Sequence, residues 1–299
     1  MNGADGVGAR LFVALQYWLP QHGLSRLVHA LARARTRWLK NGLIRAFLRG
    51  FSPDLSDALE TDPYAYPSFN AFFTRALRAD TRPIAADAAA VASPVDGTVS
   101  ECGPIRGDRL LQAKGHDYTL GALLAGRGSL AARFERGRFA TIYLAPWNYH
   151  RIHMPLAGTL AETWYVPGRL FSVNQVTAAH VAGLFARNER VICAFDGPAP
   201  FALVLVGALN VGSMETVWHG EITPRRPREL SRLDSELPAL APPRTLEKGA
   251  EMGRFNMGST VILLLPPGHA EWDTGLSAGR SVRVGERIGS LTPPLPSAR

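Results

Sequence analysis

Apolar residues in the first fifty positions recur at the three- and four-residue spacing of helices that have one apolar face. The first stripe runs over residues 11–19 and ends at Pro20. The pattern predicts two further helices, over 24–31 and 38–48, in which leucine and aromatic residues lie opposite arginines. Such helices are typical of segments that lie in a lipid interface, although helices that only cover a core would have a similar pattern.

The remaining sequence is dominated by short β-branched runs between Gly, Pro and Asp residues, and helical spacing returns only at 67–78, with Ser68 as a plausible cap, and at 174–185. The proline-rich stretch 224–243 is interpreted as a surface loop or crossover. We expect an α+β fold: a mainly antiparallel β barrel or sandwich core, with N-terminal amphipathic helices and a few peripheral helices. The predicted strands are 97–101, 138–144, 158–166, 190–196, 202–211, 259–265 and 280–288.

Charge separates the first fifty residues from the rest of the chain. They carry eight basic side chains against one acid, Asp5, and so hold most of the formal net charge of +8. Each basic residue near an anionic membrane contributes about 1 kcal/mol of attraction. A nucleic-acid partner is not expected, because it would leave the apolar helix faces unexplained and no recognition module is evident. We therefore predict a membrane-surface segment, 1–50, and a separate domain, 51–299.

The location follows from the lack of any longer apolar run. No stretch approaches the ~18 consecutive apolar residues that span a bilayer, and Asp5 argues against a signal peptide. We expect a peripheral protein on the cytoplasmic side of the cell membrane. The two cysteines, Cys102 and Cys193, exclude a disulfide scaffold and have no zinc-binding spacing, so each is interpreted as a small buried apolar residue.

Two segments carry candidate acid–base chemistry. Asp96 lies at the tip of a predicted turn in SPVDGTV (93–99), where an aspartate often bonds only its own backbone. His150 and His153 lie between two prolines, where a predicted strand runs into a loop. No further Cys or His cluster supplies the remaining ligands of a metal site, so none is predicted. A general base needs one imidazole and a carboxylate to orient it, and Asp96 is a candidate for that carboxylate.

A third segment, Gly258-Ser259-Thr260, precedes the apolar run 261–265. A triplet of this kind is usually an ordinary turn. Here the glycine leaves its carbonyl open and tolerates unusual backbone angles, and the next residue has a hydroxyl that can reach that carbonyl.

Together these segments resemble the phosphatidylserine decarboxylase family, in particular its bacterial membrane-associated branch. The resemblance covers about residues 69–265, and its motifs occur in the family's order. Asn148 stands where some relatives have Asp, and Met257 replaces the family's usual Leu. The matching stretches are FNAFFTRALRADTRPI (69–84), SPVDGTVS (93–100), PWNYHRIHMPLAG (146–158), PGRLFSVN (167–174), FARNERV (185–191), GALNVGSMET (207–216) and KGAEMGRFNMGST (248–260).

The resemblance implies a carboxy-lyase made as an inactive proenzyme, with 51–299 as its catalytic domain. By motif, Asp96, His153 and Ser259 form a charge relay for self-cleavage between Gly258 and Ser259. Ser259 becomes a covalent pyruvoyl cofactor, which forms a Schiff base with phosphatidylserine and accepts electrons as CO2 leaves to give phosphatidylethanolamine. His150 is a candidate proton donor in decarboxylation, or else a structural histidine. The resemblance also implies a heterodimer of a large chain, 1–258, and a small chain, 259–299, and leaves open whether this heterodimer forms a homo-oligomer.

Three other functions remain open on the residues alone. A biotinyl or lipoyl carrier would present a lysine at a hairpin tip, and neither Lys114 nor Lys248 lies in such a predicted hairpin. A membrane-surface scaffold would have no need of Asp96, His153 and Ser259 together. A metallohydrolase that uses His150 and His153 would be inhibited by chelators.

Overall fold

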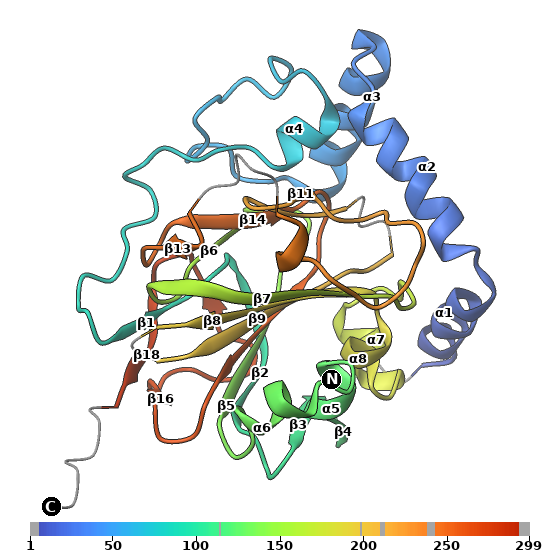
Figure 1. Ribbon diagram of the computed structural model, residues 1–299. Helices are drawn as coiled ribbons and strands as arrows, with labels where there is room; N and C mark the ends of the chain where they lie inside the picture. Colours follow the sequence, from blue (N-terminus) through green and yellow to red (C-terminus); the bar gives the residue numbers. More distant parts are fainter. Residues whose placement is uncertain (1–5, 114, 198, 210–212, 238–242, 293–299) are drawn as a thin grey trace, which may run out of the picture.

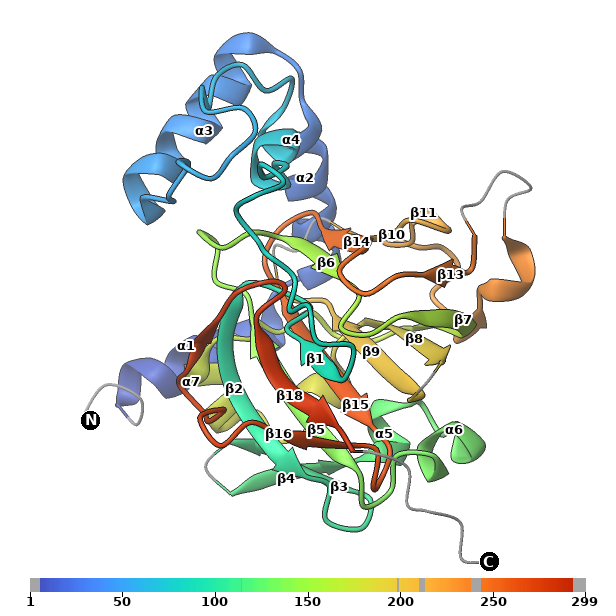
Figure 2. The ribbon, with the colours of Figure 1, turned by 90° about the vertical axis from the view of Figure 1, so that its left-hand side faces the viewer.

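The computed structural model describes residues 6–113, 115–197, 199–209, 213–237 and 243–292. Helices α1 (Val7–Trp18), α2 (Gln21–Arg33) and α3 (Arg37–Phe51) confirm the three predicted N-terminal helices. They follow one another along the outside of the β-sheets (Figures 1 and 2). No described helix is both long enough and apolar enough to cross a bilayer.

The N-terminal helices are fastened to the rest of the protein by apolar packing and by buried amides. Helix α3 packs against α4 (Phe69–Phe73), and Ile44 and Phe47 share one apolar cluster with Phe72 and Phe73. Two buried glutamines of the first two helices, at positions 16 and 21, accept hydrogen bonds from the backbone amides of residues 172 and 170. A buried amide paired in this way costs free energy to separate, so these contacts hold the helices to the β body.

The main sheet has nine strands and pairs them antiparallel. Its order is β12-β7-β8-β9-β15-β5-β2-β17, with β13 also paired to β7. Strands β12 and β17 end the order and do not pair with each other, so the described strands close no barrel and the sandwich interpretation holds. The strands are β2 (Gly97–Pro104), β5 (Arg138–Tyr143), β7 (Gly158–Val166), β8 (Arg190–Asp196), β9 (Phe201–Val206), β12 (Ser231–Arg232), β13 (Thr245–Leu246), β15 (Thr260–Leu265) and β17 (Ser281–Val282).

Three smaller sheets complete the β structure of the described residues. The four-stranded sheet, in the order β11-β10-β14-β6, lies between the main sheet and helices α3 and α4 (Figure 2). The others have the orders β1-β18-β16 and β3-β4. The strands are β1 (Ala90–Ala92), β3 (Arg109–Ala113), β4 (His116–Thr119), β6 (Arg151–His153), β10 (Met214–Thr216), β11 (Gly220–Glu221), β14 (Glu251–Phe255), β16 (Ala270–Trp272) and β18 (Arg287–Leu291).

The central strand β15 is buried on both faces. Val261, Leu263 and Leu265 belong to one apolar cluster, whereas Ile262 and Leu264 belong to the cluster on the other face. Successive side chains of a strand point to opposite faces, so a strand between two packed layers is apolar at every position. The uninterrupted apolar run after Ser259 therefore places this strand in the interior, between β5 and β9.

Some predicted elements are wrong in extent. Only α4 forms within 67–78, although Ser68 caps it as expected by accepting from the Ala71 amide at 3.1 Å. Strand 202–211 ends at Val206, and positions 210–212 lie outside the described residues. The histidine segment is not a loop throughout, because Arg151–His153 forms β6. The stretch 224–243 is largely irregular as predicted, with β12 and a short 3-10 helix, Asp234–Glu236, in its described part.

Two further predicted elements are interrupted by glycines with positive φ. The helix over 174–185 divides into α7 (Gln175–His180) and α8 (Leu184–Arg187), with Gly183 at φ 64° between them. The strand over 280–288 divides into β17 and β18 at Gly285, which has φ 82°. A left-handed residue ends a regular helix or strand, and glycine adopts this conformation at little cost. The two other short helices are α5 (Leu120–Leu123) and α6 (Gly128–Ala132).

Candidate active site

Residues 256–259 carry the chain from the four-stranded sheet to the main sheet. Met257, within this crossing, has φ 143°, which is an uncommon conformation for a residue other than glycine. Asn256 holds the crossing in place: its amide nitrogen donates to the Ser213 carbonyl at 2.9 Å, and its side-chain oxygen accepts from Asn70 at 3.0 Å. Such a backbone conformation persists only where its surroundings enforce it, and it is often found at functional sites.

Ser259 is fully buried at the start of the central strand, and its hydroxyl has no hydrogen-bond partner among the described residues. Its carbonyl accepts from the Leu144 amide at 2.8 Å, which fixes the backbone on which the hydroxyl stands. A buried hydroxyl without a partner costs about 1–3 kcal/mol and is uncommon. The arrangement leaves the Ser259 oxygen uncommitted beside the peptide bond that precedes it.

His150 is the histidine that lies against Gly258. A Cβ atom placed on Gly258 would be 3.5 Å from His150 Cε1 and 3.3 Å from the Leu144 carbonyl oxygen. The imidazole is fully buried and stacks on Phe73 with ring centroids 4.2 Å apart. Its Nε2 lies 3.3 Å from the Pro146 carbonyl oxygen, while Nδ1 has no hydrogen-bond partner among the described residues.

Burial lowers the pKa of His150 to about 3, against weaker opposing effects of nearby backbone carbonyls. The imidazole is therefore neutral at pH 7. With the Nε2 proton directed to the Pro146 carbonyl, Nδ1 keeps a free lone pair. Such a group can accept a proton from a nearby atom.

His153 lies on β6 and has other partners. Its Nδ1 is 2.7 Å from the Gly249 carbonyl oxygen, and its Nε2 is 3.1 Å from the Tyr149 hydroxyl. Burial lowers the pKa of His153, and this effect outweighs the hydrogen bond to Gly249. The neutral ring therefore donates a hydrogen bond through Nδ1 to Gly249 and accepts one at Nε2 from the Tyr149 hydroxyl. Burial also raises the pKa of Tyr149 to about 12, so that its hydroxyl keeps this proton.

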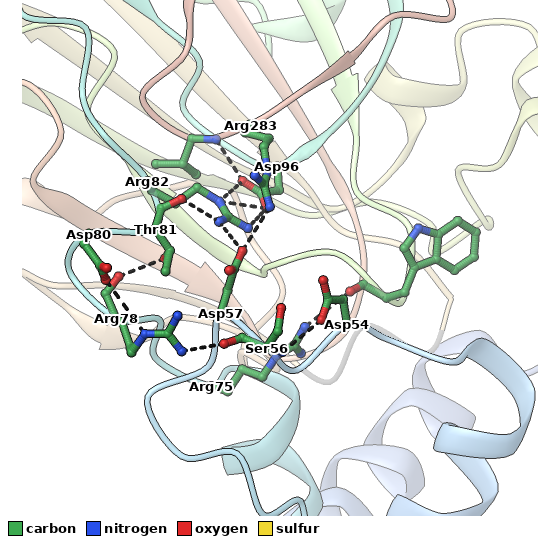
Figure 3. Close-up of polar contacts among 12 residues, drawn as sticks. Asp54, Ser56, Asp57, Arg75, Arg78, Asp80, Thr81, Arg82, Asp96 and Arg283 are labelled. Carbon is green, nitrogen blue, oxygen red and sulfur yellow. Dashed lines mark hydrogen bonds and ion pairs between the residues drawn. The ribbon is translucent and has the colours of Figure 1, made fainter.

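Asp96 is buried and committed to an arginine that the sequence did not single out (Figure 3). Arg82 donates Nη2 to Oδ2 at 2.6 Å and Nε to Oδ1 at 3.0 Å, and the Val284 amide donates to Oδ1 at 2.8 Å. Arg82 also binds Asp57 at 2.7 Å, and Asp57 binds Arg283 at 2.9 Å. A buried carboxylate needs such compensation for its lost hydration.

The predicted residues are therefore brought together only in part. His150, Gly258 and Ser259 are adjacent. The turn of Asp96 lies beside β6, where the His153 amide donates to the Pro94 carbonyl at 2.8 Å. However, no hydrogen bond among the described residues joins Asp96 to His153 or His153 to Ser259. The relay predicted for these three residues is not formed by direct contacts in this structure.

A mainly apolar cavity of about 270 Å³ opens at Gly258. Met257 and Gly258 form part of its wall, Phe73 comes from α4, and Phe47 and Phe51 come from α3. The sequence placed Phe47 in the membrane-surface segment, 1–50, and Phe51 at the start of the following domain, and nothing in their local spacing shows that they line a site. Because this helix covers the cavity, the candidate active site lies directly beneath the N-terminal helices.

Two of the other predicted features can be located. Lys248 donates to the Asp87 carbonyl at 2.6 Å, whereas Lys114 lies outside the described residues. In the described part of the chain, no three or more His, Cys, Asp or Glu side chains are grouped as a metal site would require. Cys193 is buried as expected, while Cys102 is only partly buried.

Comparisons with known proteins agree on one family. The family model described as phosphatidylserine decarboxylase matches residues 69–290, and a second model, described as PSD, matches residues 11–52. Three curated relatives are each named phosphatidylserine decarboxylase proenzyme. The protein of Methylococcus capsulatus is 52% identical, over 94% of this chain and 96% of its own. Those of Pseudomonas fluorescens and Alcanivorax borkumensis are 54% and 51% identical, over 94% and 95% of this chain and 97% of their own.

Proposed function

The chain belongs to the phosphatidylserine decarboxylase family, a family of carboxy-lyases, and from this premise we propose that it is a proenzyme that cuts itself between Gly258 and Ser259 and then decarboxylates phosphatidylserine to phosphatidylethanolamine. The observation that carries the proposal is the buried Ser259 hydroxyl, which has no partner among the described residues and follows a glycine that lies against a neutral imidazole. A hydroxyl with no other partner supports attack on the preceding carbonyl.

The cut proceeds through an ester. The Ser259 oxygen attacks the Gly258 carbonyl carbon, and the C–N bond breaks as the ester forms and the Ser259 nitrogen takes a proton. Loss of the Ser259 α-proton and cleavage of its Cβ–O bond then release the Gly258 carboxylate. The elimination leaves a dehydroalanine at position 259. Water then replaces its nitrogen, and the nitrogen leaves as ammonia. The new chain end at position 259 is a pyruvoyl group, which supplies the electron sink needed for the loss of CO2.

We assign proton removal from Ser259 to His153, oriented by Asp96, as the family motif implies. This assignment requires three changes of partner, because His153 uses Nε2 for Tyr149 and Nδ1 for Gly249, and Asp96 is held by Arg82. His150 needs no exchange, since its Nδ1 is free beside Gly258. We assign His150 to protonation of the substrate carbon after CO2 has left, for which its Nδ1 must first take up a proton, and a role in the cut is the alternative that its position supports.

The two chains, 1–258 and 259–299, are proposed to remain together as a heterodimer. The small chain begins with β15, which is paired to β5 on one side and β9 on the other, and both of these strands belong to the large chain. All six side chains of β15 are buried. Separation would expose this apolar surface and break both ladders of hydrogen bonds.

Membrane attachment is proposed for the N-terminal helices. Several of their large apolar side chains are exposed, and Trp18 and Trp38 are 89% and 76% exposed. Exposed aromatic residues beside many arginines suit a helix that lies at a lipid surface. Phe51, which is partly exposed, stands at the cavity beside Gly258, so a lipid bound beneath α3 would reach the proposed site directly from the membrane.

The proposal is tested by the intact mass of the purified protein and by release of CO2 from phosphatidylserine. We expect two chains, with a pyruvoyl mass at position 259, and decarboxylase activity. Ser259→Ala should give one uncut and inactive chain. A wild-type protein that remains one chain yet decarboxylates phosphatidylserine would refute the proposed cut.

Histidine variants distinguish the two assignments. His153→Ala and Asp96→Asn should block or greatly slow the cut. His150→Ala should be cut yet decarboxylate poorly. If His150→Ala stays uncut while His153→Ala matures at the normal rate, the base of the cut is His150 and our assignment is wrong.

A further inference from the structure

A second cavity, of about 430 Å³, lies between α2 and residues 223–228 and is unusually basic. Among its lining residues are Arg26, Arg225, Arg226 and Arg228, and the acid among them is Glu189. In the part of the chain that the structure describes, no carboxylate lies within ion-pair distance of any of these four guanidinium groups. The arginines thus form a cationic site whose charge the protein itself does not neutralise.

Buried donors in this cavity also lack partners. Ser25 is 6% exposed, and its hydroxyl has no hydrogen-bond partner among the described residues. The buried Nε of Arg225 also has no hydrogen-bond partner among the described residues. The central carbon of this guanidinium lies 5.9 Å from the centroid of the Tyr165 ring. Unsatisfied buried donors cost free energy, and a bound acceptor would remove that cost.

The acid of the cavity has a partner of its own. The Glu189 side chain accepts a hydrogen bond from the Tyr165 hydroxyl at 2.6 Å. Burial raises the pKa of Glu189, although the hydrogen bond from Tyr165 and the charge of Arg228 oppose this effect. One carboxyl that is held in this way does not balance four arginines, so the cavity favours an anion.

The chemistry of the donors identifies the kind of anion. Guanidinium groups present planar pairs of N–H donors that match the oxygens of a phosphate, and a serine hydroxyl adds one more donor. Leu27 and Leu31, on another face of the same helix, are exposed, so α2 also carries apolar side chains that suit a lipid surface. The cavity shares no lining residue with the one at Gly258.

We propose that this arginine cavity is a phosphate-binding site, separate from the site of the reacting headgroup, which takes the phosphate of an anionic phospholipid or of a free phosphorylated molecule. The site does not depend on the proposed decarboxylation. Its lining residues are different, and it is tested by phosphate binding rather than by release of CO2. Its occupation would hold α2 against residues 223–228, and thereby the N-terminal helices against the body.

The test compares the full-length protein with Arg225→Gln/Arg228→Gln. Binding is measured with sn-glycerol 3-phosphate and inorganic phosphate by calorimetry. It is measured separately by co-sedimentation with phosphatidylcholine vesicles that contain phosphatidylglycerol and no phosphatidylserine. The variant should lose about tenfold or more in affinity, the loss expected when charge-assisted hydrogen bonds to phosphate are removed. Arg106→Gln/Arg136→Gln removes the same charge at exposed positions outside both the cavity and the N-terminal helices, and is the matched control.

The two arms identify the source of the phosphate. Loss of binding in both arms supports a site open to soluble phosphates, and loss confined to vesicles supports a lipid headgroup. Arg228→Glu, at an exposed position, provides a second variant in case the double variant does not fold. The proposal is overturned if the cavity variants bind as the wild type does in both arms, or if the control loses as much affinity as they do.

Discussion

The replacement of His150 by glutamine tests whether a neutral imidazole lies buried beside Gly258. The comparison is made in a Ser259→Ala background, so that every protein in it is one uncut chain. Glutamine keeps a polar side chain of similar length but takes up no proton at mildly acidic pH. The substitution also changes the packing against Phe73, but this change in the free energy of unfolding does not depend on pH. It therefore cancels when the stabilities of one protein at two pH values are subtracted.

The expected size of the effect follows from the pKa of His150, which burial lowers from 6.5 to about 3. In the unfolded chain the ring takes up a proton as the pH falls through its ordinary value, whereas the folded protein does not. The stability contributed by His150 is therefore fully present above pH 6.5 and is lost as the pH falls toward 3. At pH 5 the loss is about 2 kcal/mol, because one pKa unit corresponds to about 1.4 kcal/mol.

The free energy of unfolding is measured in urea at pH 7 and pH 5, followed by the fluorescence of the six tryptophans. The decrease in stability between the two pH values should be smaller by about 2 kcal/mol in His150→Gln than in the parent. His269→Gln, at an exposed histidine, should keep the parent's decrease. Equal decreases in the parent and in His150→Gln would show that His150 is not held neutral by burial, and the reasoning about its role would fail.

Three further predictions concern the surroundings of the site. Arg82→Met should lower the free energy of unfolding by about 3 kcal/mol in a urea titration, because it leaves the buried carboxylate of Asp96 without its charged partner; an unchanged midpoint would contradict this. Trp18→Ser/Trp38→Ser should weaken co-sedimentation with anionic vesicles but leave the self-cut intact, and unchanged binding would refute interfacial contact by these exposed side chains. Phe51→Asp should raise the KM for phosphatidylserine more than it lowers kcat, since it places a charge at the wall of the apolar cavity, whereas unaltered kinetics would remove that cavity from the lipid's path.

Local pattern was sufficient for the elements that are long or strongly periodic. The three N-terminal helices, strands β7 and β8, and the apolar run of β15 follow from spacings of a few residues. Prediction from the local pattern failed where a contact with a residue far away in the sequence ends a helix or strand. Gln112, far along the chain, bonds the carbonyls of Ala178 and Val181 and the amide of Leu184, and so satisfies the backbone at the break between α7 and α8.

The strand predicted over 280–288 failed for the same kind of reason. The Val284 amide bonds Asp96 rather than a neighbouring strand, and a side chain at Gly285 would come within 2.6 Å of the Pro83 carbonyl oxygen. Neither contact can be inferred from the apolar spacing of the segment, because both partners lie far away in the sequence.

By itself the sequence determined the family of this protein, the run of residues at Gly258-Ser259, and the identities of the candidate acids and bases, since each of these is carried by short motifs. Only the tertiary structure decided that His150, rather than His153, lies against Gly258, and that Asp96 is held by Arg82. It also decided that a helix of the basic N-terminal segment covers the apolar cavity. The physical reason is that these hydrogen bonds and this burial, and the pKa values that depend on them, arise between residues far apart in the chain. Spacing along the sequence does not give the distances between such residues in space.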